Sequence, residues 1–140
     1  MINNLSREES FALLRASSLA RLGCIADGEP YVVPVNYVCD EVSVIIHSLP
    51  GKKIDALRAN PRVCVQVDEI RDHLNWTSVL AHGRYEEITS GAPRESAMSQ
   101  LLAAFPELTP VESVIARDAG APAPVVFRVL IDHVTGIREG

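Results

Sequence analysis

The sequence predicts a mainly β protein: a small, largely antiparallel barrel of about six strands with a few short helices. Hydrophobic residues make up 47% of the 140 residues, which suits one compact domain, 1–140, with its own core. Apolar, β-branched runs recur along the chain between turn signals. The helical patterns between them are short, and closing the sheet into a barrel would remove exposed strand edges.

Composition excludes several classes of protein. A formal net charge of -5 argues against a general nucleic-acid binder, which normally carries a basic surface. No apolar run is long enough to span a bilayer, and the start of the chain has no signal-peptide pattern, so we expect a cytoplasmic protein away from membranes. Cys24, Cys39 and Cys64 are odd in number and lack metal-type spacing. They are expected to be buried free thiols in a reducing compartment.

The first half of the chain predicts a helix followed by a three-strand meander. Ser6 and Glu9 form a capping box, which predicts a helix running to about Ser17. Asp27-Gly28 between two apolar runs is a strong hairpin signal. The expected strands are 22–26, 31–38 and 42–47.

The second half predicts two strands, a helix and a closing strand. A glycine at position 83 indicates a bulge or tight bend. Apolar residues at helical spacing predict a core-facing stripe, Met98, Leu101, Leu102 and Phe105. The expected elements are strands 62–68 and 75–88, a helix 93–105, and a strand 125–136, with loops at 69–74 and 106–124. The second loop is unusually long and suggests a cover for a pocket or a partner surface.

Two lysines stand at the start of a short helix that follows Pro50-Gly51 and ends at Asn60-Pro61. A helix N-terminus exposes free N–H groups and carries partial positive charge, so acids are favoured there. This helix has Lys52 and Lys53 instead. Such an arrangement is suited to binding an anion such as a phosphate. It is equally consistent with two lysines that simply reach into solvent.

Other conspicuous residues also carry two interpretations. Pro34 within a strand indicates an edge or a bulge, where backbone groups are free to bond something else, with Asn36 on the same face. An ordinary edge strand explains it as well. Trp76 is either core or a wall beside a flat ligand. His47 and His82 lie on predicted strands, where most histidines are ordinary hydrogen-bonded residues.

Known catalytic signatures are absent from the sequence. There is no glycine-rich dinucleotide fingerprint, no P-loop and no nucleophile elbow. The four histidines are scattered, without a metal-ligand cluster. Any redox chemistry must therefore come from a cofactor.

Five motifs in order resemble the FMN-binding split-barrel proteins. They are Pro34-Val35-Asn36-Tyr37, then Ile45-Ile46-His47-Ser48 with Gly51-Lys52-Lys53, then 57–63, then Asn75-Trp76-Thr77-Ser78-Val79 with Gly83-Arg84, and finally 126–129 with 134–136. The nearest branch is pyridoxamine 5′-phosphate oxidase-like and includes the nitroimidazole-resistance proteins. The likeness covers nearly the whole chain, and residues 106–124 fit it least well.

The resemblance implies a six-stranded antiparallel split barrel that forms a homodimer, with FMN at the subunit interface. Lys52 and Lys53 would hold the phosphate. The other residues that the resemblance places around FMN are Val33, Pro34, Val35 and Asn36 at the ring, Ile46, His47 and Ser48 along the ring and ribityl chain, and Trp76 and Ser78, which would complete the pocket. The C-terminal Arg- and His-bearing segment of true pyridoxamine phosphate oxidases is missing, so that activity is not expected.

Three functions remain open on this basis. The first is an FMN-dependent oxidoreductase acting on a small flat substrate, like the nitroimidazole reductases, with His47 as a proton donor and NAD(P)H as one possible electron donor. The second is a non-catalytic flavin carrier or sensor. The third, ranked lower because two lysines suit a compact phosphate, is a haem or deazaflavin binder on the same fold.

Overall fold

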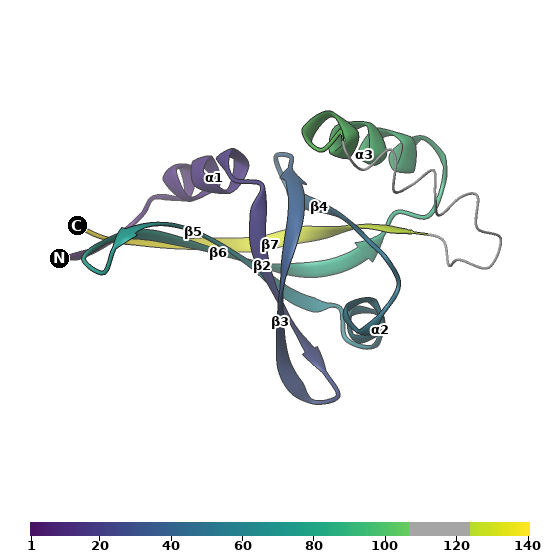
Figure 1. Ribbon diagram of the computed structural model, residues 1–140, viewed down its shortest axis with the longest axis horizontal. Coiled ribbons are helices and arrows are strands. Elements are labelled where there is room, and N and C mark those ends of the chain that lie inside the picture. The colour runs from purple at the N-terminus through teal and green to yellow at the C-terminus, as the bar shows by residue number, and fades with distance from the viewer. Residues whose placement is uncertain (107–123) are drawn as a thin grey trace.

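The computed structural model describes residues 1–106 and 124–140 and contains one antiparallel sheet of seven strands and three helices (Figure 1). The strands are β1 (Ile2–Asn4), β2 (Leu19–Ala26), β3 (Glu29–Cys39), β4 (Ser43–Ser48), β5 (Arg62–Asp72), β6 (Asn75–Glu87) and β7 (Val125–Glu139). The helices are α1 (Arg7–Ala16), α2 (Lys52–Ala59) and α3 (Gly91–Ala104).

Six of the strands close into a ring, as the sequence predicts. The sheet order is β1-β7-β4-β3-β2-β5-β6, and β6 pairs back onto β7. The meander is confirmed, since β3 pairs with both β2 and β4. Asp27 and Gly28 have φ of 53° and 77°, the left-handed backbone that a tight hairpin turn requires.

The ring is open on one side of β3, which makes the barrel a split one. β3 pairs with β2 from Glu29 to Asn36, but with β4 only from Tyr37 to Cys39. The outer part of the β2–β3 hairpin therefore projects away from the barrel (Figure 1). α1 and α3 lie on one side of the sheet in this view, and α2 lies on the other.

Buried aliphatic and aromatic side chains fill the barrel. Tyr37 and Phe127 are among the largest fully buried residues, and α1 adds Leu14. The Tyr37 hydroxyl donates a 2.5 Å hydrogen bond to the Leu14 carbonyl, which satisfies a polar group that burial would otherwise penalise. The capping box is present as predicted, with Ser6 and Glu9 each accepting from the other's backbone N–H at 3.0 Å.

Gly83 lies at the predicted irregularity. The β6–β7 register shifts between His82 and Gly83, and an added Cβ at Gly83 would clash with the Leu130 carbonyl oxygen. Only a residue without a side chain lets the two strands approach this closely.

Some strand boundaries differ from the predictions, and one strand is not predicted at all. The loop expected at 69–74 is mostly strand, because β5 runs to Asp72 and only His73 and Leu74 form the turn. Its exposed polar side chains hide the alternation on which sequence patterns depend. The short strand β1 is additional and exists only through its pairing with β7. β7 itself ends at Glu139 rather than at position 136.

Of the remaining expectations, the helix is confirmed, and the long loop lies mostly outside the described residues. α3 starts two residues before the predicted helix and buries part of the predicted stripe, with Leu101 buried and Met98 and Phe105 packed beside it. The predicted loop at 106–124 lies almost entirely outside the described residues. Across residues 1–106 and 124–140, no helix has both the length and the apolar character needed to cross a membrane.

Candidate functional site

The open edge of β3 creates the backbone of the site. The Tyr37 N–H donates to the Ser18 carbonyl on the β2 side, at 3.0 Å. Because backbone nitrogens alternate in direction along a strand, those of residues 34 and 36 face the opposite edge, where β4 pairing has not yet begun. Pro34 has no N–H to leave unsatisfied there, so this edge is compatible with its proline.

A hollow of about 280 Å³ lies at this edge, and we call it the strand-edge hollow. It gathers five of the predicted site residues from three elements: Pro34, Val35, Asn36, His47 and Lys53. α3 supplies Leu101, and its C-cap residue Phe105 also lines the hollow. The sequence assigned these two to a core stripe, and helical periodicity alone does not reveal that such a stripe also borders a pocket. The lining is therefore partly apolar and partly polar.

Lys53 is the charged group of the strand-edge hollow. Its side chain is half-buried, and burial lowers the pKa of its ammonium group below the ordinary value. Within the part of the chain that the structure describes, no carboxylate acts on this amine. The other titratable group that acts on it is the Cys24 thiol, whose own pKa is raised by burial, so that it carries no charge near neutral pH. A half-buried cation without a counter-charge is a favourable position for an anionic ligand.

Lys52 points a different way from its neighbour. It is exposed, its ammonium lies 5.0 Å from the centre of the Tyr31 ring, and it lines a separate hollow on α2. Gly51, the N-cap of α2, provides no side-chain hydrogen bond to the free amides of the first turn. Lys52 and Lys53 are the only lysines in the sequence.

Three predicted residues of β3 and β4 contribute no side chain to the strand-edge hollow. Ile46 is buried in the core, and Val33 packs against the core while remaining partly exposed. The Ser48 hydroxyl donates to the Leu49 carbonyl at 2.9 Å. Their neighbours on the same strands do line the hollow.

Trp76 and Ser78 are not brought together with Lys53 within one chain. Both lie on β6, which starts at the end of the molecule where the two termini lie, while α2 is at the other end (Figure 1). Trp76 lines a hollow with residues of α1 and the C-terminus. The Ser78 hydroxyl accepts a 3.1 Å hydrogen bond from Gln66. Their assignment to a flavin pocket stays a prediction that needs a second subunit.

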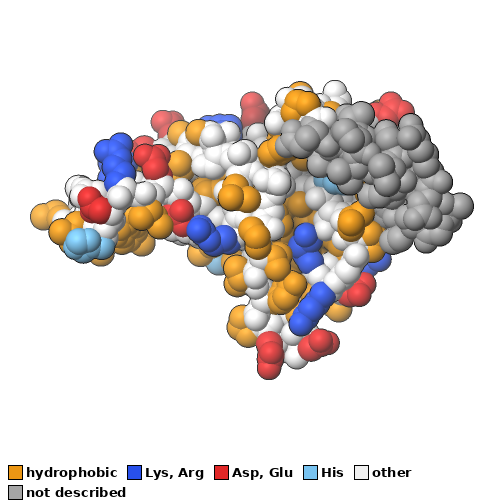
Figure 2. Space-filling model, viewed as in Figure 1, with side chains coloured by type: hydrophobic (Ala, Val, Ile, Leu, Met, Phe, Trp, Pro, Cys, Tyr) orange, Lys and Arg blue, Asp and Glu red, His pale blue; other side chains and the backbone are white. Residues whose placement is uncertain are grey.

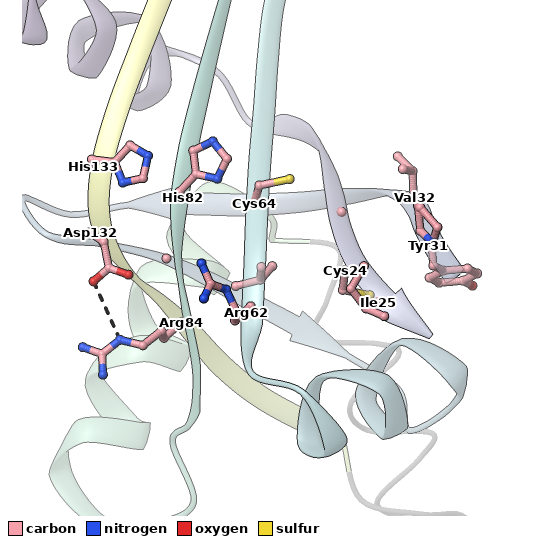
Figure 3. Close-up of a pocket in the computed structure, with 14 residues that line it drawn as sticks. Cys24, Ile25, Tyr31, Val32, Arg62, Cys64, His82, Arg84, Asp132 and His133 are labelled. Atoms are coloured by element: carbon pink, nitrogen blue, oxygen red, sulfur yellow. Dashed lines mark ion pairs between the residues drawn. The ribbon is translucent and has the colours of Figure 1, made fainter. Parts of the chain in front are cut away.

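The outer face of the sheet carries a larger hollow, of about 460 Å³, that the sequence did not predict (Figure 3). Figure 3 shows His133, His82 and Cys64 in a row across β7, β6 and β5, and the strand register places them opposite one another. The two imidazole rings stack with centroids 4.6 Å apart. Arg84 pairs with Asp132 nearby, at 3.7 Å. Such a row forms only when three strands from different parts of the chain align.

The cysteines differ partly from expectation. All three are free thiols, but only Cys24 is buried, while Cys39 and Cys64 are partly exposed. Burial raises the pKa of the Cys39 thiol to about 11. No group of three or more potential metal ligands occurs in residues 1–106 and 124–140.

Comparisons with known proteins place this geometry in a family. The model of the pyridoxamine 5′-phosphate oxidase family matches residues 6–138. The chain is also 38% identical, over 141 residues, to an uncharacterized protein of Rhizobium meliloti (strain 1021). That alignment covers 94% of this chain and 91% of the relative.

Solved structures agree with the sequence comparisons. A FAD-binding protein from Mesorhizobium loti is 36% identical, with a TM-score of 0.84 over 100% of this chain and 98% of that one. A Bacteroides thetaiotaomicron protein for which 5-nitroimidazole antibiotic resistance has been suggested is 19% identical. Its TM-score is 0.74 over 99% of this chain and 87% of that one, a likeness of fold alone.

Proposed function

The chain belongs to the pyridoxamine 5′-phosphate oxidase family, and from that premise we propose that it is a flavoprotein that binds FMN in the strand-edge hollow. The observation that carries the proposal is the half-buried Lys53, which has no counter-charge among the described residues and lines the same hollow as the open edge of β3. Free amides at the start of α2 add to its attraction for a phosphate. The phosphate would bind at Lys53, with Lys52 beside it.

The proposed activity is that of an oxidoreductase acting on a small flat substrate. A bound flavin supplies hydride or electron transfer, and the chain supplies position and electrostatics. Asn36 offers an amide to polar atoms of the ring, and Pro34 presents an edge with no N–H to desolvate. His47 lines the hollow and is the residue proposed to donate a proton to the substrate. Leu101 and Phe105 form the apolar wall against a flat substrate.

We propose further that two copies complete the site. Leu19, Ile25, Val32 and Ile137 are 39–63% exposed on the outer face of the sheet, the face that carries the hydroxyl of Ser78. Figure 2 shows apolar atoms spread over the β2–β3 hairpin, at the lower edge of that view. An apolar surface of this kind is typical of a protein–protein interface. A partner on this face would bring its Ser78 and Trp76 towards the flavin, which one chain does not do.

FAD is the second candidate cofactor. The Mesorhizobium loti relative, at 36% identity, is described as FAD-binding, and a 23% identical Mycobacterium smegmatis protein with a TM-score of 0.68 has the same description. FAD carries the phosphate and ring of FMN plus an adenosine monophosphate, so both cofactors would use Lys53 in the same way.

The visible spectrum of the purified protein, alone and after addition of FMN, tests the cofactor. We expect flavin bands at about 370 and 450 nm that co-elute with the protein on gel filtration at the size of a dimer. A Soret band, or no chromophore even after flavin addition, would contradict the proposal. Mixing the loaded protein with NADH or NADPH and an acceptor then tests activity. A tightly bound flavin that stays inert would favour the carrier or sensor function instead.

A further inference from the structure

The first turn of α2 separates two hollows. Lys53 lines the strand-edge hollow, whereas Lys52, the preceding residue, lines a second one of about 400 Å³, which we call the α2 hollow. Lys52 and Lys53 are consecutive in the chain, so the two hollows border the same turn of α2. The volume of the α2 hollow lies within the roughly 300–1,000 Å³ that small-molecule sites occupy.

The α2 hollow is lined by both apolar and charged residues. Ile25 at the end of β2, with Ala56 and Ala59 of α2, supplies the apolar surface. Ile25 is 40% exposed within one chain, and it lies where the α2 hollow meets the apolar face proposed for the partner copy. The charged groups that line the hollow are Lys52, Asp27 and Asp55. Among the described residues, neither of these carboxylates forms an ion pair, which leaves their oxygens available as acceptors.

This combination suits a neutral nucleoside better than a second anion. The flat base of a nucleoside covers apolar surface, and its ribose hydroxyls donate hydrogen bonds to carboxylates, a pairing that dinucleotide-binding proteins also use. Two carboxylates against one lysine would repel a ligand that brought an additional phosphate into the hollow. The ligand's phosphates would have to lie outside it, at the start of α2.

We propose that the α2 hollow holds the adenosine of FAD, with the diphosphate at Gly51–Lys53 and the isoalloxazine ring in the strand-edge hollow. The inference rests on the proposed function, because it needs a flavin in the strand-edge hollow. It adds a distinct site and a preference for the dinucleotide over FMN. Lys52, held against Tyr31, lies on the adenosine side of the diphosphate, and Lys53 lies on the flavin side.

The test fills the α2 hollow and compares the two flavins. Ala59 is exposed and is the last residue of α2, so Ala59→Trp places a large side chain in the hollow without disturbing the core. Ala16 is the last residue of α1, is also exposed and lies outside the α2 hollow, and Ala16→Trp is the matched control. Flavin-fluorescence titrations of the full chain give the dissociation constants of FAD and FMN for the wild type and each variant.

We expect the wild type to bind FAD at least about tenfold more tightly than FMN. Ala59→Trp should bring the FAD constant to that of FMN and leave the FMN constant unchanged, while Ala16→Trp should alter neither. If Ala59→Trp does not fold, the double variant Asp27→Asn/Asp55→Asn replaces it, since asparagine tolerates the left-handed backbone of position 27. That variant should weaken FAD severalfold and leave FMN binding unweakened.

Two results would overturn the inference while leaving the proposed function intact. One is equal binding of FAD and FMN by the wild type. The other is a preference for FAD that survives filling of the hollow or removal of both carboxylates. Failure to bind either flavin would overturn the proposed function and this inference together.

Discussion

Replacement of both lysines by alanine should remove most of the affinity for flavin and leave the fold intact. Charge-assisted hydrogen bonds contribute about 1.5–3 kcal/mol each, so the double variant Lys52→Ala/Lys53→Ala should lose roughly 3–6 kcal/mol of binding free energy. That corresponds to at least about a hundredfold rise in the dissociation constant. Lys53→Ala alone should account for the larger part of the lost free energy of FMN binding, because Lys53 lines the strand-edge hollow and Lys52 does not.

The stability of the flavin-free protein should change little in the same variant. Neither lysine forms an ion pair within the described residues, and a positive charge in the first turn of a helix is unfavourable by about 0.3–1 kcal/mol. Alanine also has the higher helix propensity. Urea unfolding without flavin checks this expectation, and flavin-fluorescence quenching gives the affinities.

Arg58→Ala is the control for loss of charge on the same helix. Arg58 lies in the last turn of α2, where it pairs with Glu87 at 2.5 Å and lines neither hollow. We expect its flavin affinity to match that of the wild type. If the double lysine variant also binds flavin as the wild type does, both lysines are merely solvated and the phosphate assignment is refuted.

Two further predictions concern the fold. Burial raises the pKa of the Tyr37 hydroxyl far above its ordinary value of 10.0. The unfolded chain therefore loses this proton first, and the free energy of unfolding should fall as pH rises above about 10. Urea unfolding of Tyr37→Phe should show a weaker fall with pH, and a pH profile identical to that of the wild type would contradict this. Gly83→Ala should destabilise the protein by about 1–3 kcal/mol, because the new methyl group meets the Leu130 carbonyl. Gly51→Ala, where an added Cβ has nothing within 4 Å, is the control in the same unfolding measurement, and equal stability of the two variants would disprove the clash.

Local signals predicted the elements well wherever the sequence contains a helix cap, a tight turn or a conspicuous glycine. The capping box at Ser6, the turn at Asp27-Gly28 and the glycine at position 83 each act within a few residues or through one close approach. The extension of β5 to Asp72 escaped prediction because its outer residues are exposed and polar. β1 escaped because three residues carry no pattern, and only the distant β7 gives them a hydrogen-bonding partner.

The residues of the candidate site likewise include some that the sequence could identify and some that it could not. Pro34, Asn36, His47 and Lys53 could be named from the sequence through the family resemblance, and the fold places them around one hollow. Leu101 and Phe105 could not, because their periodicity indicates only that one helix face is apolar. It does not indicate which pocket that face borders.

The sequence by itself determined the strand content, the positions of the turns, and two adjacent lysines at a helix start. The tertiary structure decided what those lysines face: Lys53 borders the open edge of β3, and Lys52 borders a separate hollow at Ile25. It also decided that Trp76 and Ser78 lie away from both. The physical reason is the distance along the chain over which each interaction acts. Caps and turns act between near neighbours in the chain, whereas a pocket forms where β3, β4, α2 and α3 meet, and only closure of the sheet brings them together.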